Sequence, residues 1–183
     1  MAIHRVVLTY EDYLAMPDDG RRYEILDGEV AVTAAPVTLH QVIVGNLYSV
    51  LRDHVRGRHL GEVFFAPLTV FLANTTVVEP DLVYIDSART GQVGERGITG
   101  PPSLLIEVLS PSTAGNDRGA KFQLYARYSV PCYWIVDTDA RALEAYELGV
   151  DGYRLVDRVQ GETPVSLPPF HDLTLVPDEL WRR

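Results

Sequence analysis

Two acidic residues stand out because each borders or interrupts an apolar stretch. Glu107 is the one charged residue within residues 104–109, and Asp81 directly precedes the apolar residues 82–85. A carboxylate on a buried strand is unfavourable unless another group neutralises it. Two carboxylates on neighbouring strands would raise each other's pKa, so a hard divalent cation is the natural third member of such a pair. The alternatives to a metal site are that Glu107 faces solvent or pairs with an arginine, and that Asp81 is an ordinary turn aspartate.

Lys121 is the only lysine of the chain and follows Glu107 by fourteen positions. A strand, a short turn and a returning helix would bring it back over the end of the strand. There it could orient or activate a water molecule and stabilise charge on a phosphoryl group. The alternative is a surface ion pair with Asp117, four residues earlier on the same helix face, which would contribute about 0.3–0.5 kcal/mol.

Glu24 is a further candidate for the same site. It lies in the expected strand 23–26, where alternation places its side chain on the face opposite to its two neighbours. An exposed glutamate on a strand is the favoured alternative. We expect His40 to cap the following helix or to face solvent, and Tyr125 to pack its helix onto the sheet.

Composition excludes several function classes. The 183-residue chain has a formal net charge of −9 at pH 7, so it lacks the broad basic face of most duplex-binding proteins, which leaves only a local cationic groove for such a partner. Its single cysteine, Cys132, allows no intramolecular disulfide and no cysteine-based zinc site, which fits the cytoplasm. The sequence has no phosphate-binding loop, GxGxxG, HExxH or GxSxG motif. We also expect no signal peptide and no membrane span.

Apolar periodicity and turn residues predict helices at 10–16, 38–56 and 116–129. They predict strands at 62–72, 77–85, 103–109 and 132–137, and two hairpins, 23–26 with 29–33 and 143–148 with 153–156. Residues 89–102 are expected to form a loop, and the C-terminal segment is expected to be irregular up to residue 178. We therefore expect one domain over residues 1–183, with a mixed α/β fold around a central sheet flanked by helices.

Several of these residues also belong to a longer pattern. It comprises Pro80-Asp81, Glu107-Val108-Leu109-Ser110-Pro111-Ser112-Thr113, Asp117-Arg118, Lys121 and Tyr125, together with segment 23–29, His40 and strand 133–137. Over nearly its whole length the chain thereby resembles the Uma-type family of restriction endonucleases, a branch of the PD-(D/E)xK nuclease superfamily. The resemblance implies a restriction-endonuclease-like core with a mixed four-stranded sheet, extra hairpins and metal-dependent cleavage of phosphodiester bonds.

The resemblance also implies roles for individual residues. Asp81 and Glu107 would bind Mg²⁺, with Mn²⁺ as a substitute, and the carbonyl of Val108 would reach the same metal. In the superfamily a lysine lies two residues after the second acid, but this chain has Leu109 at that position. The family pattern indicates that Lys121 takes over the role of that lysine.

Glu24 resembles an additional N-terminal acid of such nucleases, and the resemblance further implies a nucleic-acid substrate, DNA, and a homodimer. Two alternatives stay open. A nuclease-fold binding or assembly module without cleavage is suggested by the net charge and the missing strand lysine. A metal-dependent hydrolase of a small phosphorylated molecule would need no basic groove, and a closed pocket beside Glu107 would favour it.

Overall fold

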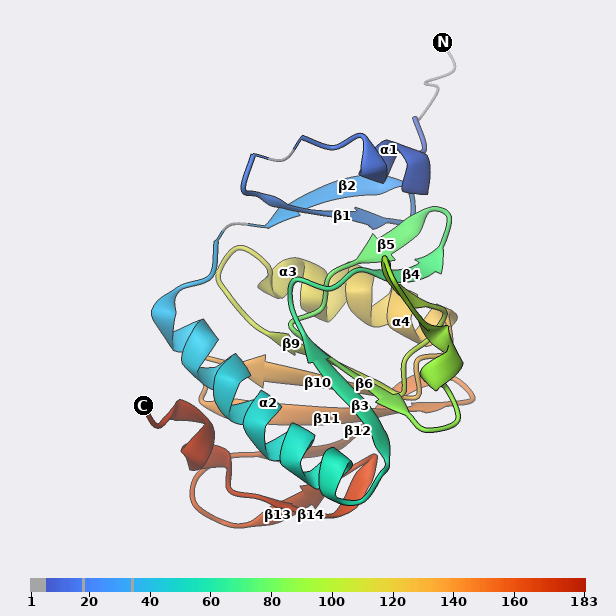
Figure 1. Ribbon diagram of the computed structural model, residues 1–183. Coiled ribbons are helices and arrows are strands. Elements are labelled where there is room, and N and C mark those ends of the chain that lie inside the picture. Colours follow the sequence, from blue (N-terminus) through green and yellow to red (C-terminus); the bar gives the residue numbers. More distant parts are fainter. Residues whose placement is uncertain (1–5, 18, 34) are drawn as a thin grey trace.

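The computed structural model describes residues 6–17, 19–33 and 35–183, and it has a mixed α/β fold. The predicted fold class is confirmed, and most of its strands divide between two large sheets where we expected one central sheet. Helices lie beside and between these sheets (Figure 1). The arrangement follows from the sequence because the central strands are apolar on both faces and must be covered on both.

The sheet that carries the acid pair has six strands among the described residues. Their order is β12 (Gly152–Val159), β11 (Ala142–Gly149), β10 (Cys132–Asp137), β9 (Leu104–Val108), β6 (Leu82–Asp86) and β3 (Gly61–Phe65). β9 and β10 are parallel and all other neighbours are antiparallel. The predicted central position of the two most apolar strands is confirmed, since β9 and β10 lie in the middle of the sheet.

The N-terminal sheet supplies the other half of the site. Its described strands are β2 (Glu29–Thr33), β1 (Arg22–Leu26), β5 (Thr76–Val78), β4 (Val70–Ala73), β8 (Gly97–Thr99) and β7 (Val93–Gly94), in that order. The predicted hairpin between β1 and β2 is confirmed. Its turn residues Asp27 and Gly28 have φ angles of 53° and 83°, the left-handed conformation that an Asp-Gly pair tolerates.

Helices cover both faces of the sheet that carries the acid pair (Figure 1). α2 (Thr38–Gly57) packs one apolar face on the core that it shares with the C-terminal hairpin β13 (Val165–Leu167) and β14 (Phe170–Leu175). The opposite face packs against α4 (Phe122–Arg127) and residues of the N-terminal sheet. The shorter described helices are α1 (Tyr10–Leu14), η1 (Thr90–Gln92), α3 (Ala114–Asn116), the π-helical turn η2 (Asp117–Lys121) and η3 (Pro177–Trp181). None of the helices in the described part of the chain is long and apolar enough to cross a membrane.

Alternation along the central strands fixes the direction in which Glu107 points. In β9, Leu104, Ile106 and Val108 contact the α2 core, whereas Leu105 contacts the core beneath α4. Glu107 shares the parity of Leu105, so its side chain points toward the helix that follows β9. This is the helix whose first turns carry the single lysine.

Two predicted strands are each divided between the two sheets. The strand expected at 77–85 is β5 and β6 in different sheets, because Pro80 cannot donate to a ladder. The strand expected at 62–72 divides in the same way into β3 and β4, around the cis peptide bond before Pro67. The expected loop at 89–102 contains the β7–β8 hairpin, and the expected irregular tail contains the β13–β14 hairpin.

Candidate active site

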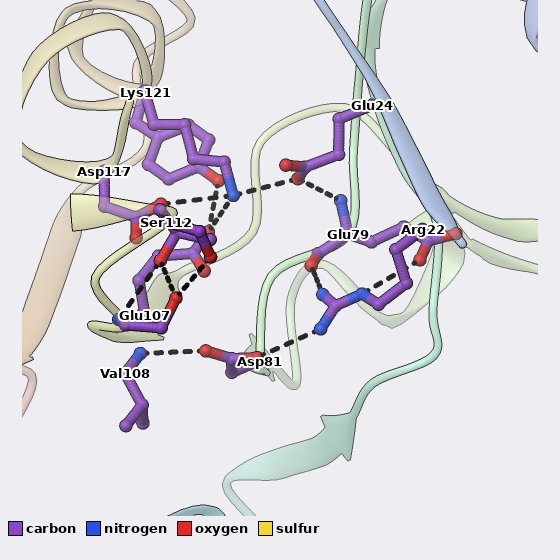
Figure 2. Close-up of polar contacts among 12 residues, drawn as sticks. Arg22, Glu24, Glu79, Asp81, Glu107, Val108, Ser112, Asp117 and Lys121 are labelled. Carbon is purple, nitrogen blue, oxygen red and sulfur yellow. Dashed lines mark hydrogen bonds and ion pairs between the residues drawn. The ribbon is translucent and has the colours of Figure 1, made fainter. Parts of the chain in front are cut away.

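Asp81 and Glu107 lie opposite each other at the ends of two neighbouring strands. β6 and β9 are antiparallel, and Leu82 is paired with Ile106. Extending this register by one residue places Asp81 opposite Glu107. Both residues are buried, with 4% and 3% of their surface exposed. The two carboxylates that the sequence predicted to be neighbours are therefore neighbours in the fold (Figure 2).

Lys121 connects the acids of the site. Its Nζ lies 2.9 Å from Glu107 Oε1, 2.9 Å from Glu24 Oε1 and 3.4 Å from Asp117 Oδ1. Only 4% of its side chain is exposed. The strand, turn and returning helix thus bring the lysine over the end of β9, as the spacing predicted. The alternative of a surface Asp117–Lys121 pair is wrong, because both residues are buried.

Glu24 enters the site from β1 of the other sheet. Its Oε1 also accepts a hydrogen bond from the backbone N–H of Glu79 at 2.8 Å. The alternative of an exposed strand glutamate is wrong, because Glu24 is buried. The two sheets therefore meet at Lys121. Glu24 comes from the N-terminal sheet, Glu107 from β9 and Asp117 from the helical segment after β9 (Figure 2).

Asp81 is held by three donors. Val108 N donates to Asp81 Oδ2 at 2.8 Å, His40 Nε2 lies 3.0 Å from the same oxygen, and Arg22 Nη1 lies 3.4 Å from Oδ1. Burial opposes ionisation of Asp81, but the His40 and Val108 hydrogen bonds and the Arg22 charge outweigh it and lower its pKa. Val108 therefore contacts the site through its amide, whereas the family resemblance pointed to its carbonyl.

The pKa of Glu107 shifts in the opposite direction to that of Asp81. Burial raises the pKa of Glu107 well above its usual value, and the Lys121 charge only partly opposes this effect. Tyr125 donates its hydroxyl to Glu107 Oε1 at 2.8 Å, so both Lys121 and Tyr125 contact the same oxygen. Burial likewise raises the pKa of Asp117. Burial alone would lower the pKa of Lys121, but the surrounding carboxylates raise it well above its usual value.

A cavity of about 250 Å³ opens beside the acid pair. Its charged or ionisable lining residues are Arg22, His40, Asp81, Glu107 and Lys121, and the loop that follows β9 adds the hydroxyls of Ser110, Ser112 and Thr113. Three of the predicted catalytic residues thus line one cavity. Glu24, the fourth, contacts Lys121 but is not among the lining residues.

The carboxylates of the site outnumber its permanent cations. Around the lysine and Arg22, two permanent cations, lie the carboxylates of Glu24, Glu79, Asp81, Glu107 and Asp117. A bound cation would offset this excess of negative charge and would favour the ionised form of Glu107, which burial disfavours. Over residues 6–17, 19–33 and 35–183, no three or more His, Cys, Asp and Glu residues are grouped as metal ligands. Two carboxylates completed by water suit Mg²⁺, which keeps several waters and typically takes only one or two protein carboxylates.

Sequence reasoning missed His40, Arg22 and Glu79, whose carboxylate lies 3.5 Å from Arg22. His40 was expected to cap α2 or face solvent, but it is buried against Asp81. Arg22 carried no signal, since a single arginine at the start of a strand is ordinary. Tyr125 packs its helix as expected, and its hydrogen bond to Glu107 adds a polar role. Tyr125 lies four residues after Lys121 on the same helix face and belongs to the family pattern, and both facts pointed to its place beside the lysine.

The comparisons with known proteins concern both sequence and fold. Two uncharacterized proteins of Synechocystis sp., slr1290 and sll1609, are 28% and 26% identical to the chain over 177 and 160 residues, covering 96% and 85% of it and 92% and 89% of their own lengths. A crystal structure from Anabaena variabilis, described as a "putative nuclease belonging to DUF820", has a TM-score of 0.78 at 19% identity and covers 95% of this chain and 97% of that one. This likeness shows a nuclease-like fold. The Uma2 family, described as "Putative restriction endonuclease", matches residues 10–178. The chain belongs to this Uma2 family.

Proposed function

We propose that the protein is a magnesium-dependent endonuclease that hydrolyses phosphodiester bonds of nucleic acid, with DNA as the substrate. The observation that carries the proposal is the pairing of Asp81 with Glu107 at one cavity that Lys121 also lines. The Uma2 family and the nuclease-like fold support the same class of activity.

Asp81 and Glu107 would hold the ion, which when bound lowers the pKa of a water molecule and offsets charge on the phosphate. Mn²⁺ would substitute. The carbonyl of Val108 is a further candidate ligand, as in the resemblance. Lys121 orients the attacking water or stabilises the charge that develops on the phosphoryl group, and its contact with Glu107 fixes that carboxylate.

The remaining residues position this machinery. Glu24 and Asp117 hold the lysine ammonium in place through ion pairs. Tyr125 and Lys121 both contact Oε1 of Glu107, so neither contact occupies Oε2. The amide of Val108 orients Asp81 through Oδ2. These contacts hold the carboxylates of Asp81 and Glu107 in position for a cation.

The test is cleavage of plasmid and single-stranded DNA with Mg²⁺, with Mn²⁺ and with a chelator. We expect cutting that needs the metal, and a loss of at least about 100-fold in Asp81→Asn, Glu107→Gln and Lys121→Met. Asp151→Asn, an exposed acid in the turn after β11, is the matched control for loss of one negative charge and should cut like the unmodified protein. Calorimetric titration should show a Mg²⁺ or Mn²⁺ site that Asp81→Asn abolishes. Metal-independent cutting, or metal binding unchanged in Asp81→Asn, would refute the assignment.

A nuclease-fold binding module without cleavage is the second candidate. One observation favours it, because the Lys121 ammonium is almost fully enclosed by three acids and not openly presented to a substrate. A protein that binds DNA but never cuts it, with either metal, would establish this alternative.

A third candidate is a hydrolase of small phosphorylated molecules, which the limited volume of the cavity favours. Bis(p-nitrophenyl) phosphate, a diester, and p-nitrophenyl phosphate, a monoester, separate the readings. The endonuclease should hydrolyse the diester alone. Preferential hydrolysis of the monoester would favour the third candidate.

We also propose a homodimer that completes a substrate channel, in a reducing compartment such as the cytoplasm. The free and buried thiol of Cys132 is compatible with that compartment. Light scattering at micromolar concentration tests the oligomeric state, and the mass of a single chain there would refute the dimer.

A further inference from the structure

Arg22 is the one permanent cation of the cavity that is partly exposed, among the described residues that line it. Its side chain is 23% exposed, whereas that of Lys121 is 4% exposed. The cavity otherwise carries the negative charge of the acid pair. A phosphodiester that entered the cavity would be repelled unless a cation with an accessible N–H group contacted it.

Lys121 is the less accessible of the two cations. Its Nζ donates a hydrogen bond to Glu107 Oε1 at 2.9 Å, and carboxylate oxygens of Glu24 and Asp117 lie 2.9 and 3.4 Å away. Only 4% of its side chain is exposed, so a phosphate in the cavity meets the guanidinium of Arg22 more readily than this ammonium. Lys121 therefore acts on the substrate mainly through its charge and through the position of Glu107.

Arg22 has N–H groups that make no hydrogen bond. Its guanidinium carries five N–H groups but makes two hydrogen bonds, one from Nη2 to the carbonyl of Glu79 and one of 3.4 Å from Nη1 to Asp81. The second is at the outer limit of hydrogen-bond length. Nε is buried 3.5 Å from the Glu79 carboxylate and has no hydrogen-bond partner, so it is not accessible to a ligand. Each Nη carries a second N–H group that makes no hydrogen bond, and two such groups on one planar guanidinium suit bidentate binding of a phosphate.

Hydroxyl groups on the loop after β9 face the same cavity. Ser110 Oγ lies 3.0 Å from Ser112 Oγ and 3.0 Å from Thr113 Oγ1. Hydroxyl hydrogens rotate freely, so these groups can turn a donor toward an anion without any change in charge. Figure 2 shows Arg22 and Ser112 approaching the acid pair from different sides.

We propose that Arg22 and the hydroxyls of Ser110 and Ser112 form the phosphate-binding subsite of the cavity, and that Arg22 is the residue that contacts the phosphodiester directly. This inference rests on the proposed nuclease function and assigns the substrate contact within it. Arg22, from β1, is thus a further catalytic residue beside Asp81, Glu107 and Lys121.

The test is binding of a fluorescein-labelled single-stranded oligothymidylate, followed by anisotropy in a chelator and in Ca²⁺, conditions chosen to exclude cutting. We expect Arg22→Ala to weaken binding by about 10- to 100-fold, because a hydrogen bond to a charged group contributes about that much. Arg22→Lys keeps the charge but loses the planar fork, and should fall between Arg22→Ala and the unmodified protein. Ser112→Ala should weaken binding by about 3- to 10-fold.

Arg21 is the matched control. It is the neighbouring arginine, it is exposed, it pairs with Asp19, and it does not line the cavity. Arg21→Ala removes the same charge from the same strand end, and should weaken binding less than about twofold if the contact is local. Equal losses in Arg21→Ala and Arg22→Ala would refute the subsite, because general attraction would then explain both. Absence of binding by the unmodified protein in both conditions would also refute it.

The variants distinguish a loss of phosphate binding from a loss of folding and from a loss of cleavage activity. Arg22→Lys retains the charge beside Asp81, so it tests the proposal even if Arg22→Ala unfolds, and melting curves report which case applies. If Arg22→Lys binds as tightly as the unmodified protein, the bidentate contact is refuted. If the unmodified protein binds with this Arg22 dependence but never cuts with Mg²⁺ or Mn²⁺, the proposed endonuclease activity fails and the subsite stands.

Discussion

Replacing Lys121 with Met tests whether the lysine holds the site together. Met keeps most of the length of the side chain and removes the charge. Three buried carboxylates, those of Glu24, Glu107 and Asp117, would then lose their shared cation. At an effective dielectric constant of about 20, a unit charge at 2.9 Å attracts a carboxylate by about 6 kcal/mol before any cost is counted.

The net effect is smaller than this gross attraction. Burying an ammonium group costs several kcal/mol, which offsets much of the attraction, and removal of one partner from a buried ion pair typically costs about 3–5 kcal/mol. We therefore expect Lys121→Met to lower the free energy of unfolding by about 3–5 kcal/mol at neutral pH. That amount is a large share of the stability of an ordinary domain.

Urea unfolding at several pH values, followed by circular dichroism, measures this loss. Burial already raises the pKa of Glu107 and Asp117, so protonation of these acids as the pH falls should relieve the unpaired charge in Lys121→Met. The difference from the unmodified protein should therefore shrink toward acidic pH. Adding Glu107→Gln to Lys121→Met should restore part of the stability. A variant within about 0.5 kcal/mol of the unmodified protein at neutral pH would refute the view of Lys121 as a buried hub.

Three further predictions concern individual groups. Tyr125→Phe should lower the free energy of unfolding by about 1.5–3 kcal/mol in urea, because it removes a hydroxyl donor to Glu107, and a loss below about 0.5 kcal/mol would contradict that role. The pKa of Asp81 is lowered in the fold, so its contribution is complete above the unfolded value of about 3.9 and is lost as the pH falls through the folded value. Thermal melts should accordingly show less acid destabilisation in Asp81→Asn, and parallel curves for the two proteins would argue against it. Burial raises the pKa of Cys132 to about 12, so its thiol should react with a disulfide reagent at pH 8 only after unfolding, and fast reaction of the native protein would count against the buried position.

The acid pair and the lysine could be predicted from sequence because each broke a local rule. Glu107 was the charge in an apolar run, and Asp81 followed a proline that cannot donate to a sheet ladder. The spacing from Glu107 to Lys121 matched one strand, one turn and the start of a helix. These signals are local, and local patterns also fixed the hairpins and the long helix.

The rest of the site depended on contacts between distant segments. Arg22 reaches the acids from another sheet, and no pattern in the sequence marks it. Glu24 was a candidate, supported by the family resemblance, but an exposed glutamate was the favoured alternative. His40 lies at the start of α2, where a capping or exposed role was the ordinary expectation, yet packing buries it on Asp81. The crossing of the chain between sheets at Pro80 turned one expected strand into two. Long-range packing of this kind overrides local propensity and leaves no periodic trace.

The division of the site between two sheets has a consequence for how the protein loses function. Arg22 and Glu24 belong to the N-terminal layer, whereas Asp81 and Glu107 end strands of the other. A fragment that began at α2 would keep both carboxylates of the pair, yet the lysine would lose one of its three counterions. Detachment of β1 and β2 would remove Arg22 and Glu24 from the cavity and expose part of the core beneath α4, so the geometry of the site depends on the packing of the two sheets against each other.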